Sequence, residues 1–535
     1  MFDDQTLTLL DFYPSKGTFL PNRPIELVVS GESSRHLNLR FEFIIHSGVE
    51  LEGSISESVI LEAGHFQRSF FWNPLISIPK AYGAELRIFS EDNDKKSALY
   101  LLETAFDSLE SWTDSPRYGF LTDFYEDRED CAKTILALTK LHINGLQFYD
   151  WQFRHDELVP PTDLYVDPLG RKLALTKVLE LIEQAQASGI TAMPYLAIYG
   201  ASYDFWHRHK EWGLYDENQK PILFGEQFLG IMNPENGGKW QNHLLEQCSR
   251  LLENIPFDGL HIDQYGDPKA GWNIDGMEIN IPATFADFID KVHLAHPEKA
   301  ILFNAVGNWP IEVLARSPVS FNYIEVWPPD VAYTDLIRIV RDAQKLSGGK
   351  PVVVALYLHS NQPANILLAE AVILAAGGTR IKFGESAKLL ADPYFPKYEE
   401  IPKKLFLSLR RYADFSVRYE DWMKSNELFE CTQISGLPAG VLPFVRKVKQ
   451  GWSICLVNLA DPNAYCWNVT HSPPSPVEGF SFGFALPGEI ADIWMVDPDS
   501  SSICPQRVDL SMNQNKVIVK VEKLKNMLVF FIQTK

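Results

Sequence analysis

Two stretches decide the fold: Phe257-Asp258-Gly259-Leu260-His261-Ile262-Asp263-Gln264-Tyr265-Gly266 and Phe321-Asn322-Tyr323-Ile324-Glu325-Val326-Trp327. Each is predicted to be a buried strand that ends on an acid flanked by aromatic or amide residues. A carboxylate is costly to bury without a partner, so one such ending is unusual. Two of them in one chain predict a pair of carboxylates that face each other across the mouth of a barrel.

These stretches belong to a series of eight strand-and-helix units. The strand candidates are Tyr118–Asp123, Ile143–Trp151, Ile190–Gly200, Phe257–Gly266, Lys299–Gly307, Phe321–Pro328, Pro351–Leu358 and Gly377–Glu385. Helical patterns follow at Glu129–Leu141, Leu173–Ala187, Lys239–Asn254, Ala283–His293, Ile311–Arg316, Asp335–Leu346, Pro363–Ala376 and beyond Pro396. Eight βα units predict a TIM-type (β/α)8 barrel over residues 113–420, with its chemistry at the strand ends. The alternative is an open doubly wound sheet, which would normally have a glycine-rich turn where this chain has Asp123-Phe124-Tyr125-Glu126.

Antiparallel β-sandwich domains are predicted on both sides of the barrel, at residues 1–112 and 421–535. In the first, Leu37, Leu39, Phe41 and Phe43 alternate with polar residues, which is typical of a half-buried strand. In the second, strand-like runs occur at Gly451–Ala460, Ile490–Pro498, Lys516–Leu524 and Met527–Thr534. The predicted architecture is therefore multidomain, α/β in the middle and β at both ends.

Composition narrows the class of partner. The formal net charge of −20 argues against nucleic acid or an anionic membrane surface, because both require a basic footprint. A neutral substrate fits better. Aromatic residues make up 12% of the chain and include 13 Trp, which either fill large cores or offer flat platforms for sugar rings. We make no prediction of oligomeric state.

Compartment and redox state are predicted from the chain start and the cysteines. The acidic start Met1-Phe2-Asp3-Asp4-Gln5 lacks a signal peptide, so we expect a cytoplasmic protein, or a secreted one if a signal has been removed. No apolar run reaches the roughly 18 residues of a membrane helix. The six Cys show no metal-binding spacing, and Cys131 and Cys248 are expected to be buried free thiols.

Acids, amides and aromatic residues gather at the C-terminal ends of the predicted strands, which predicts a binding site. The candidates are Gln147, Tyr149, Asp150, Trp151, His155, Tyr195, Tyr199, His261, Asp263, Gln264, Asn304, Glu325, Trp327, Tyr357, His359, Lys382 and Glu385. A pair of acids is the machinery of glycoside hydrolysis, in which one attacks or activates water and the other protonates the leaving oxygen. His261 alternates with Asp263, so both should point into the barrel, where His261 is either a core group or a sugar contact. Asp258 is interpreted as a turn or capping residue.

Two other kinds of chemistry are weighed. A catalytic metal is not expected, because the barrel metallohydrolases need His-x-His on the first strand and the only such pair, His207 and His209, lies in a loop. No other cofactor is expected. Lys382 is a candidate Schiff-base lysine of an aldolase-like barrel, but that class leaves the two acids and the aromatic lining unexplained.

Four motifs resemble glycoside hydrolase family 66: Tyr118-Gly119-Phe120 with Asp123-Phe124, Gln147–Trp151, Asp258–Gln264 and Tyr323–Trp327. That family contains dextranases and cycloisomaltooligosaccharide glucanotransferases, which act on α-1,6-glucan. The resemblance implies that Asp263 is the nucleophile and Glu325 the general acid/base of a retaining reaction. It implies that Asp150 is a third essential carboxylate, which holds glucose hydroxyls in the outermost subsite. We expect Glu325 to be kept protonated by apolar surroundings such as Trp327, and Asp263 to be charged.

One departure from the family bears on the products. Cyclising members often carry a large carbohydrate-binding module after strand seven, whereas here Leu358-His359-Ser360-Asn361-Gln362-Pro363 leads almost directly into a helix. The aromatic loop Ala201–Trp206 is expected to shape subsites. We therefore expect hydrolysis to dominate, with a glucanotransferase as the first alternative. A non-catalytic glucan-binding protein is the alternative from another class.

Overall fold

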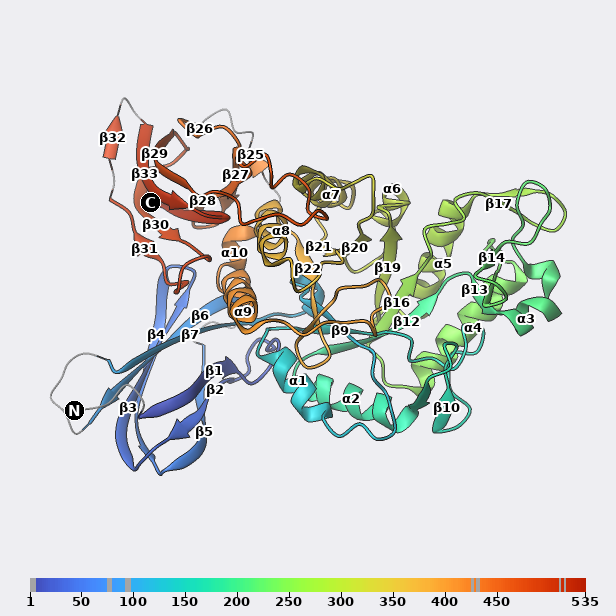
Figure 1. Cartoon of the computed structure of the whole chain (residues 1–535), viewed down its shortest axis with the longest axis horizontal. Coiled ribbons are helices and arrows are strands. Elements are labelled where there is room, and N and C mark those ends of the chain that lie inside the picture. The colour runs from blue at the N-terminus through green and yellow to red at the C-terminus, as the bar shows by residue number, and fades with distance from the viewer. Residues whose placement is uncertain are drawn as a thin grey trace.

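The computed structural model describes residues 6–74, 79–91, 98–424, 428–429, 434–509, 511–513 and 516–535. Residues 1–5, on which the signal-peptide prediction depends, and Cys431 lie outside these ranges. Two β regions, from the two ends of the chain, lie together at one end of an elongated molecule, and the α/β region extends to the other (Figure 1). Each helix within the described ranges is too short or too polar to cross a bilayer.

The central sheet curls in the manner of a TIM barrel. Seven parallel strands are neighbours in chain order: β8 (Tyr118–Leu121), β9 (Gly145–Phe148), β12 (Thr191–Ala197), β16 (Gly259–Asp263), β19 (Ala300–Val306), β20 (Asn322–Glu325) and β21 (Val352–Ala355). The predicted eighth strand is interrupted at Lys382. Its first part, β22 (Thr379–Ile381), pairs with β21, and its second part, β23 (Phe383–Gly384), pairs with β8 and also with β24 (Lys388–Leu389). All the predicted barrel strands are present, and each is shorter than predicted.

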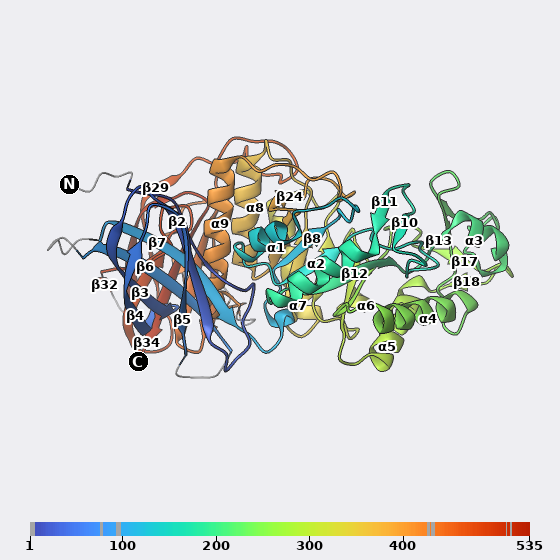
Figure 2. The ribbon, with the colours of Figure 1, turned by 90° about the horizontal axis from the view of Figure 1, so that it is seen from below.

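Helices follow the strands and cover the outside of the curled sheet (Figures 1 and 2). They are α1 (Cys131–Thr139), α2 (Leu175–Ala187), α4 (Lys239–Asn254), α5 (Ile281–Ala295), α6 (Ile311–Leu314), α7 (Tyr333–Leu346), α8 (Pro363–Ala376) and α9 (Lys403–Arg418). Most are amphipathic, as expected for helices that cover a sheet. Nearly every side chain of α8 is buried, because α8 packs against β22 on one side and against the C-terminal strands on the other.

Short elements in the loops build a rim above the C-terminal strand ends. The loop after β9 contains β10 (Leu164–Val166) and β11 (Lys172–Ala174). The loop after β12 contains β13 (Gly200–Ser202), α3 (Tyr203–Arg208), β14 (Leu223–Phe224) and β15 (Leu229–Ile231), and the loop after β16 contains β17 (Gly271–Trp272) and β18 (Glu278–Ile279). A bridge between Tyr215 and Trp272 joins these last two loops at the far end of the molecule.

The N-terminal region consists of two antiparallel sheets over one core. Their orders are β1 (Leu7–Pro14), β2 (Ile25–Ser33), β5 (Gly64–Trp72) and β4 (Glu50–Leu61), β3 (Leu37–Ser47), β6 (Lys80–Ser90), β7 (Tyr100–Ser108). The alternating apolar residues of β3 face the other sheet, since Phe43 lies 4.5 Å and Phe41 5.7 Å, ring centre to ring centre, from Phe70 of β5.

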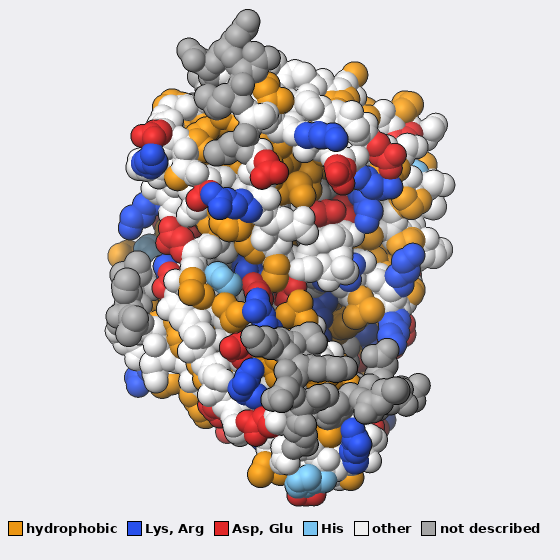
Figure 3. Space-filling view, turned by 90° about the vertical axis from the view of Figure 1, so that its left-hand side faces the viewer, with side chains coloured by type: hydrophobic (Ala, Val, Ile, Leu, Met, Phe, Trp, Pro, Cys, Tyr) orange, Lys and Arg blue, Asp and Glu red, His pale blue; other side chains and the backbone are white. Residues whose placement is uncertain are grey.

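The C-terminal region also has two antiparallel sheets over a common core. One contains β25 (Leu428–Phe429), β27 (Val441–Val448), β28 (Gly451–Asn458), β34 (Met527–Thr534), β30 (Ile490–Val496) and β31 (Gln506–Arg507). The other contains β26 (Ile434–Ser435), β29 (Val477–Phe484), β33 (Lys516–Leu524) and β32 (Ser511–Asn513). Acidic and basic side chains are interspersed over the described part of the outer face of the β regions (Figure 3).

Both β regions join the barrel through α9 and α10 (Glu420–Met423). The buried guanidinium of Arg418, at the end of α9, donates to Glu85 of β6 at 3.0 Å. The next residue, Tyr419, stacks on Phe531 of β34 with ring centres 4.6 Å apart. The three regions therefore share buried contacts at this junction.

Candidate active site

A pocket of about 620 Å³ opens at the C-terminal ends of the barrel strands. Most residues predicted from the strand ends line it: Gln147, Tyr149, Asp150, His155, Tyr195, Asp263, Gln264, Asn304, Glu325, Trp327 and Tyr357. They come together because parallel strands end at the same edge of the sheet, although the residues are far apart in sequence. The volume is that of a site for a small molecule or a few sugar units.

The centre of the pocket holds two carboxyl groups joined by one amide. Asp263 is the last residue of β16, Glu325 is the last residue of β20, and Asn304 lies on β19 between them. Asn304 Nδ2 donates to Asp263 Oδ1 at 2.8 Å and to Glu325 Oε2 at 2.7 Å. These two oxygens therefore lie no more than about 5.5 Å apart, the sum of the two distances.

The carboxyl pair sits in surroundings that disfavour charge. Burial and the neighbouring charge of Glu325 raise the pKa of Asp263 to about 7, against the hydrogen bonds of Asn304 and Tyr195. Burial also raises the pKa of Glu325, although Asn304, Trp327 and Tyr357 stabilise its charge by hydrogen bonds. Trp327 Nε1 donates to Glu325 Oε1 at 2.7 Å. The expectation of a charged Asp263 beside a protonated Glu325 is therefore not reproduced: the pKa values of both groups are raised, and Trp327 stabilises the charged form of Glu325.

Asp150 supplies a third carboxyl group through an unusual backbone conformation. It has a φ of 51°, in the left-handed region that Asp tolerates better than most residues. Arg171 Nη2 donates to its main-chain oxygen at 2.8 Å. Burial raises the pKa of the Asp150 carboxyl to about 7, with Arg171 opposing and Asp167 adding to the shift.

Aromatic rings form the walls and rim of the pocket. Tyr149 stacks on Phe395 with ring centres 4.5 Å apart and 12° between the planes. Phe224 of β14 stacks on Tyr265 at 4.6 Å, and its own side chain is 45% exposed. Trp327 is 37% exposed and lies beside Tyr357. Exposed flat rings next to polar groups are suited to a ligand that has both apolar and hydroxyl-bearing faces.

Several lining residues were not predicted from the sequence. They are Pro168, Leu169, Phe224, Phe228, Lys269, Pro328, Pro329, Pro393, Tyr394 and Phe395, among others. Most belong to long loops, which have no strand or helix period. The sequence feature that could have identified some of them is an aromatic residue next to a turn residue, as in Phe224-Gly225 and Pro393-Tyr394-Phe395-Pro396.

Three predicted contact residues lie beneath the pocket instead of on its wall. Trp151 is fully buried, and its Nε1 donates to the Tyr195 carbonyl at 3.2 Å. The hydroxyl of Tyr199 accepts from the backbone N–H of Tyr265 at 3.0 Å, which supports the loop after β16. His261 points into the barrel as expected, but it is a core group, 3.1 Å from the Tyr118 hydroxyl.

Lys382 and Glu385 belong to ion pairs away from the pocket. Lys382 and Arg380 both contact Glu370 of α8, at 2.7 and 2.6 Å, so the lysine lies between the barrel and the helix layer. The aldolase alternative therefore lacks a lysine in the pocket at the position where it was predicted.

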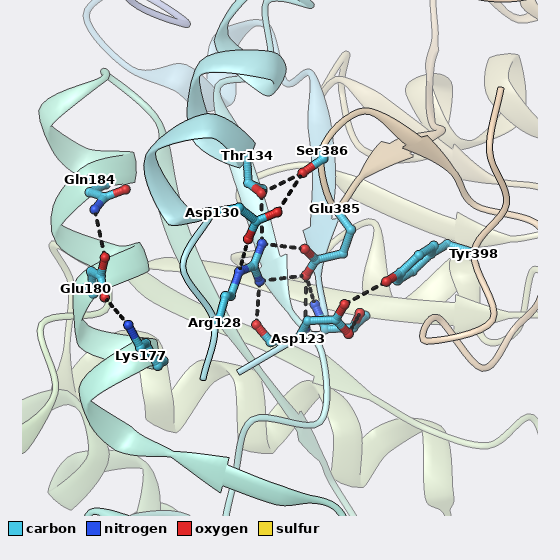
Figure 4. Close-up of polar contacts among 11 residues, drawn as sticks. Asp123, Arg128, Asp130, Thr134, Lys177, Glu180, Gln184, Glu385, Ser386 and Tyr398 are labelled. Atoms are coloured by element: carbon cyan, nitrogen blue, oxygen red, sulfur yellow. Dashed lines mark hydrogen bonds and ion pairs between the residues drawn. The ribbon is translucent and has the colours of Figure 1, made fainter. Parts of the chain in front are cut away.

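Glu385 does not line the pocket, and Figure 4 shows its side chain pointing toward Arg128, 2.7 Å away. Its carboxylate also accepts from the backbone N–H groups of Thr122 and Asp123. Glu385 therefore ties the end of the eighth strand to the end of the first. It was predicted to contact the substrate, but its contacts are those of a structural residue.

The described ranges contain no group of three or more His, Cys, Asp and Glu side chains arranged to hold a metal. Asp258 is at the opposite end of β16, where it accepts from the Ala192 N–H at 2.8 Å. The pocket itself offers the chemistry of its carboxyl groups. Two carboxyl groups at this separation can divide the roles of nucleophile and proton donor.

Comparisons with known proteins agree with this chemistry. The model of glycosyl hydrolase family 66 matches residues 54–529. Two cycloisomaltooligosaccharide glucanotransferases of Niallia circulans are 27% identical over 282 residues and 28% identical over 270 residues. The matches cover 48% and 46% of this chain but only 29% and 28% of those proteins, so the chain spans less than a third of their length.

Solved structures show the same fold. A Paenibacillus cycloisomaltooligosaccharide glucanotransferase complexed with cycloisomaltoheptaose superposes with a TM-score of 0.90 at 19% identity, covering 98% of this chain and 100% of the other. A maltogenic α-amylase from Thermotoga neapolitana gives a TM-score of 0.50 at 13% identity, covering 78% and 99%. The family match extends over most of the sequence and includes every strand end described above. The chain belongs to glycosyl hydrolase family 66, the family that its strand-end motifs resemble.

Proposed function

We propose that the enzyme cleaves α-1,6-linked glucan with net retention, using Asp263 as nucleophile and Glu325 as general acid/base. The observation that carries the proposal is the contact of Asn304 Nδ2 with both carboxyl groups, which limits their nearest oxygens to about 5.5 Å. Retaining enzymes keep these groups about 5–5.5 Å apart, whereas inverting enzymes need about 6.5–9.5 Å to admit a water molecule.

In the first step a carboxylate oxygen of Asp263 bonds to the anomeric carbon. The bond from that carbon to the glycosidic oxygen breaks, and Glu325 gives its proton to the departing oxygen. In the second step Glu325 takes a proton from water or a sugar hydroxyl, whose oxygen displaces Asp263 from the anomeric carbon. The pKa of about 7 at Asp263 leaves the pair partly protonated near neutral pH, as a reaction that needs one acid and one base requires. Burial also raises the pKa of Glu325.

Asp150 holds sugar hydroxyl groups in this proposal. With a pKa of about 7 it both donates and accepts hydrogen bonds near neutral pH, which suits a hydroxyl ligand. The exposed rings of Trp327 and Phe224 stack on neighbouring sugar units. The α-1,6-glucan substrate class is supported by the family and by the cyclic isomaltooligosaccharide bound to the Paenibacillus enzyme.

Hydrolysis is the proposed main outcome, and transfer to form cyclic products is the second candidate. The names of the Niallia and Paenibacillus relatives favour transfer. The connection from β21 to α8, residues 356–362, favours hydrolysis because it is too short to contain a sugar-binding module.

Asp263→Asn and Glu325→Gln test the assignment. Each should lower kcat on dextran by several orders of magnitude while circular dichroism shows an intact fold, because each removes one half of the carboxyl pair. With an activated aryl glycoside, azide should restore turnover to Glu325→Gln, since it replaces the base-activated water of the second step. Azide should not rescue Asp150→Asn.

Either catalytic variant keeping more than about a tenth of wild-type activity on dextran would overturn the assignment. Equal azide rescue of the Glu325 and Asp150 variants would show that the roles are wrongly divided. Tight oligosaccharide binding by the wild-type protein without any product would favour the non-catalytic alternative.

A further inference from the structure

Asn304 is placed between the two catalytic strands by the sheet itself. Its strand, β19, pairs with β16 on one side and β20 on the other. On the β16 side, Ile262 pairs with Phe303, so the next residues, Asp263 and Asn304, lie at the same level of the sheet. On the β20 side, Asn304 pairs with Tyr323, two residues before Glu325. The side chain is 4% exposed and lines the pocket.

Within the described part of the chain, both hydrogen bonds of the Asn304 side chain go to the carboxyl pair. Its two N–H groups are directed one to Asp263 and one to Glu325. Its carbonyl oxygen has no hydrogen-bond partner within the described part of the chain. The reverse orientation of the amide would set an acceptor oxygen against two carboxylate oxygens, which would be repulsive.

An amide is well suited to this position because it donates two hydrogen bonds and does not ionise. A lysine or histidine there would add a charge, and a carboxyl group would add a third acid to the pair. Each hydrogen bond favours the charged form of the carboxyl group that accepts it. Removing the amide should therefore disturb both the spacing of the pair and its protonation.

We propose that Asn304 is a positioning residue of the reaction, an inference that rests on the proposed function. It holds the nucleophile and the acid/base at the separation needed for retention and stabilises their charged forms together. Other titratable groups facing the pair or lining its pocket are Asp150, His155, Asp267, Lys269 and the hydroxyls of Tyr149, Tyr195, Tyr265, Tyr323, Tyr357 and Tyr394. None of the hydrogen bonds of the Asn304 side chain goes to them, so its loss acts first on the pair.

The test compares Asn304→Leu, which keeps the approximate shape without the donors, with Asn304→Asp, which is isosteric and adds an acid. Both should lower kcat on isomaltooligosaccharides by about 100-fold or more, the usual loss for a donor aimed at a reacting group, with a smaller change in KM. The acidic limb of the kcat/KM profile should move to higher pH by roughly one unit in the Leu variant and further in the Asp variant.

Asn322→Leu is the matched control. Asn322 is buried on β20, the strand of Glu325, but it donates to Ser347 Oγ at 3.0 Å beside the other end of that strand. Its loss should lower the melting temperature without moving the pH profile. A merely structural role of Asn304 would give the same pattern, so an unmoved acidic limb in both Asn304 variants would overturn the inference.

The two proposals fail in different ways. If Asp263→Asn and Glu325→Gln are inactive and the Asn304 profiles match that of the wild type, only the role of Asn304 is wrong. If Asp263→Asn and Glu325→Gln stay active, the proposed function is wrong. Should the Leu variant not fold, the isosteric Asp variant carries the test alone.

Discussion

At the scale of single residues, the pocket contains carboxyl groups whose surroundings disfavour the ionised form and so raise their pKa values. Asp150 is buried and Asp263 is partly buried, and each has a pKa raised to about 7 from an ordinary value of 3.8. Reaction chemistry needs such groups, but folding must desolvate them. The protein therefore carries a cost in stability at its active site that depends on pH.

The direction of this dependence follows from the sign of the shift. Because the folded pKa is the higher one, the folded state binds more protons than the unfolded state between about pH 4 and pH 7. The contribution of each acid to stability is fully present below that window and is lost as pH rises through about 7. Neutral amides in the same places do not have this dependence.

We therefore expect Asp150→Asn to unfold at a higher temperature than the wild type at pH 8, with the difference shrinking toward pH 4. Scanning calorimetry at several pH values measures this. Asp127→Asn, which changes an exposed acid, should leave the melting temperature unaltered at every pH. A variant less stable than the wild type at pH 8 would contradict the prediction.

The sequence was a good guide to residues whose direction follows from strand alternation. Asp263, Asn304 and Glu325 lie on strands and point into the pocket. Trp151 was misplaced because Asp150, in its left-handed conformation, turns the chain so that Trp151 packs beneath the pocket. Lys382 was misplaced because its partner Glu370 lies on α8, which the strand pattern does not reveal.

At the scale of elements, the eighth βα loop shows how a wall of the pocket is fixed. The loop begins with Glu385, Ser386 and Ala387, three consecutive non-glycine residues with φ between 27° and 67°. Left-handed backbone costs such residues about 1–2 kcal/mol each, so other contacts must hold it. Glu385 binds Arg128, and Ser386 Oγ lies 2.7 Å from Thr134 Oγ1 (Figure 4). The same loop then carries Tyr394 and Phe395 to the pocket.

Arg128→Met should loosen this wall without touching the carboxyl pair. It leaves Glu385 buried without its cation, and breaking a buried pair in this way costs about 3–5 kcal/mol. KM should rise several-fold while kcat changes less, since the Phe395 platform moves and the reacting groups do not. Steady-state kinetics and thermal melts provide the measurement.

Lys177→Met is the control for that change, because it breaks the partly exposed pair with Glu180 drawn in the same view. Surface pairs contribute little, so neither KM nor stability should change measurably. A large effect on kcat with an unchanged KM in the Arg128 variant would show that the loop acts on the reaction itself.

Elements were predictable where burial imposed a pattern. Most of the barrel strands are largely apolar segments between helical ones, whereas the eighth, residues 379–384, contains Arg380 and Lys382; all eight occur. The short strands of the rim, such as β14 and β17, are two residues long, which is too short for any alternation to be visible in the sequence. Their pairing depends on contacts between loops that are distant in the chain.

At the scale of the whole molecule, the two β regions lie at the end of the molecule opposite the rim (Figures 1 and 2). Their sheets meet the barrel at α8, α9 and α10. Residues 465–471 of the C-terminal region also reach the loops after β20 and β21, where Trp467 Nε1 donates to the Asp330 carbonyl and Gln362 donates to Thr470. The far end of a long glucan held in the pocket would have to cross much of the molecule to reach the sheets themselves, so the sheets are poorly placed to return a chain end to the glucosyl-enzyme.

We accordingly expect dextran digests to contain linear isomaltooligosaccharides, with some transfer products at high substrate. Water then competes well with the chain's own end, whose effective concentration is not raised by a second binding site. Mass spectrometry distinguishes the outcomes, because a cyclic product is lighter than its linear counterpart by one water. A predominance of the lighter species at early times would make the enzyme a glucanotransferase.

The short connection between β21 and α8 is also a site where a further domain could be inserted, in evolution or by engineering. Its backbone is held from within, since His359 N–H donates to Gln362, and by a neighbouring loop, since Ser360 N–H donates to Glu399. Asn361 at its tip is exposed, and exposed loop tips tolerate inserted domains. A domain inserted at Asn361 is therefore expected to leave β21 and α8, on either side of the connection, folded. If that module bound sugar, it would raise the effective concentration of the glucan's far end, and its gain or loss would shift the balance between linear and cyclic products.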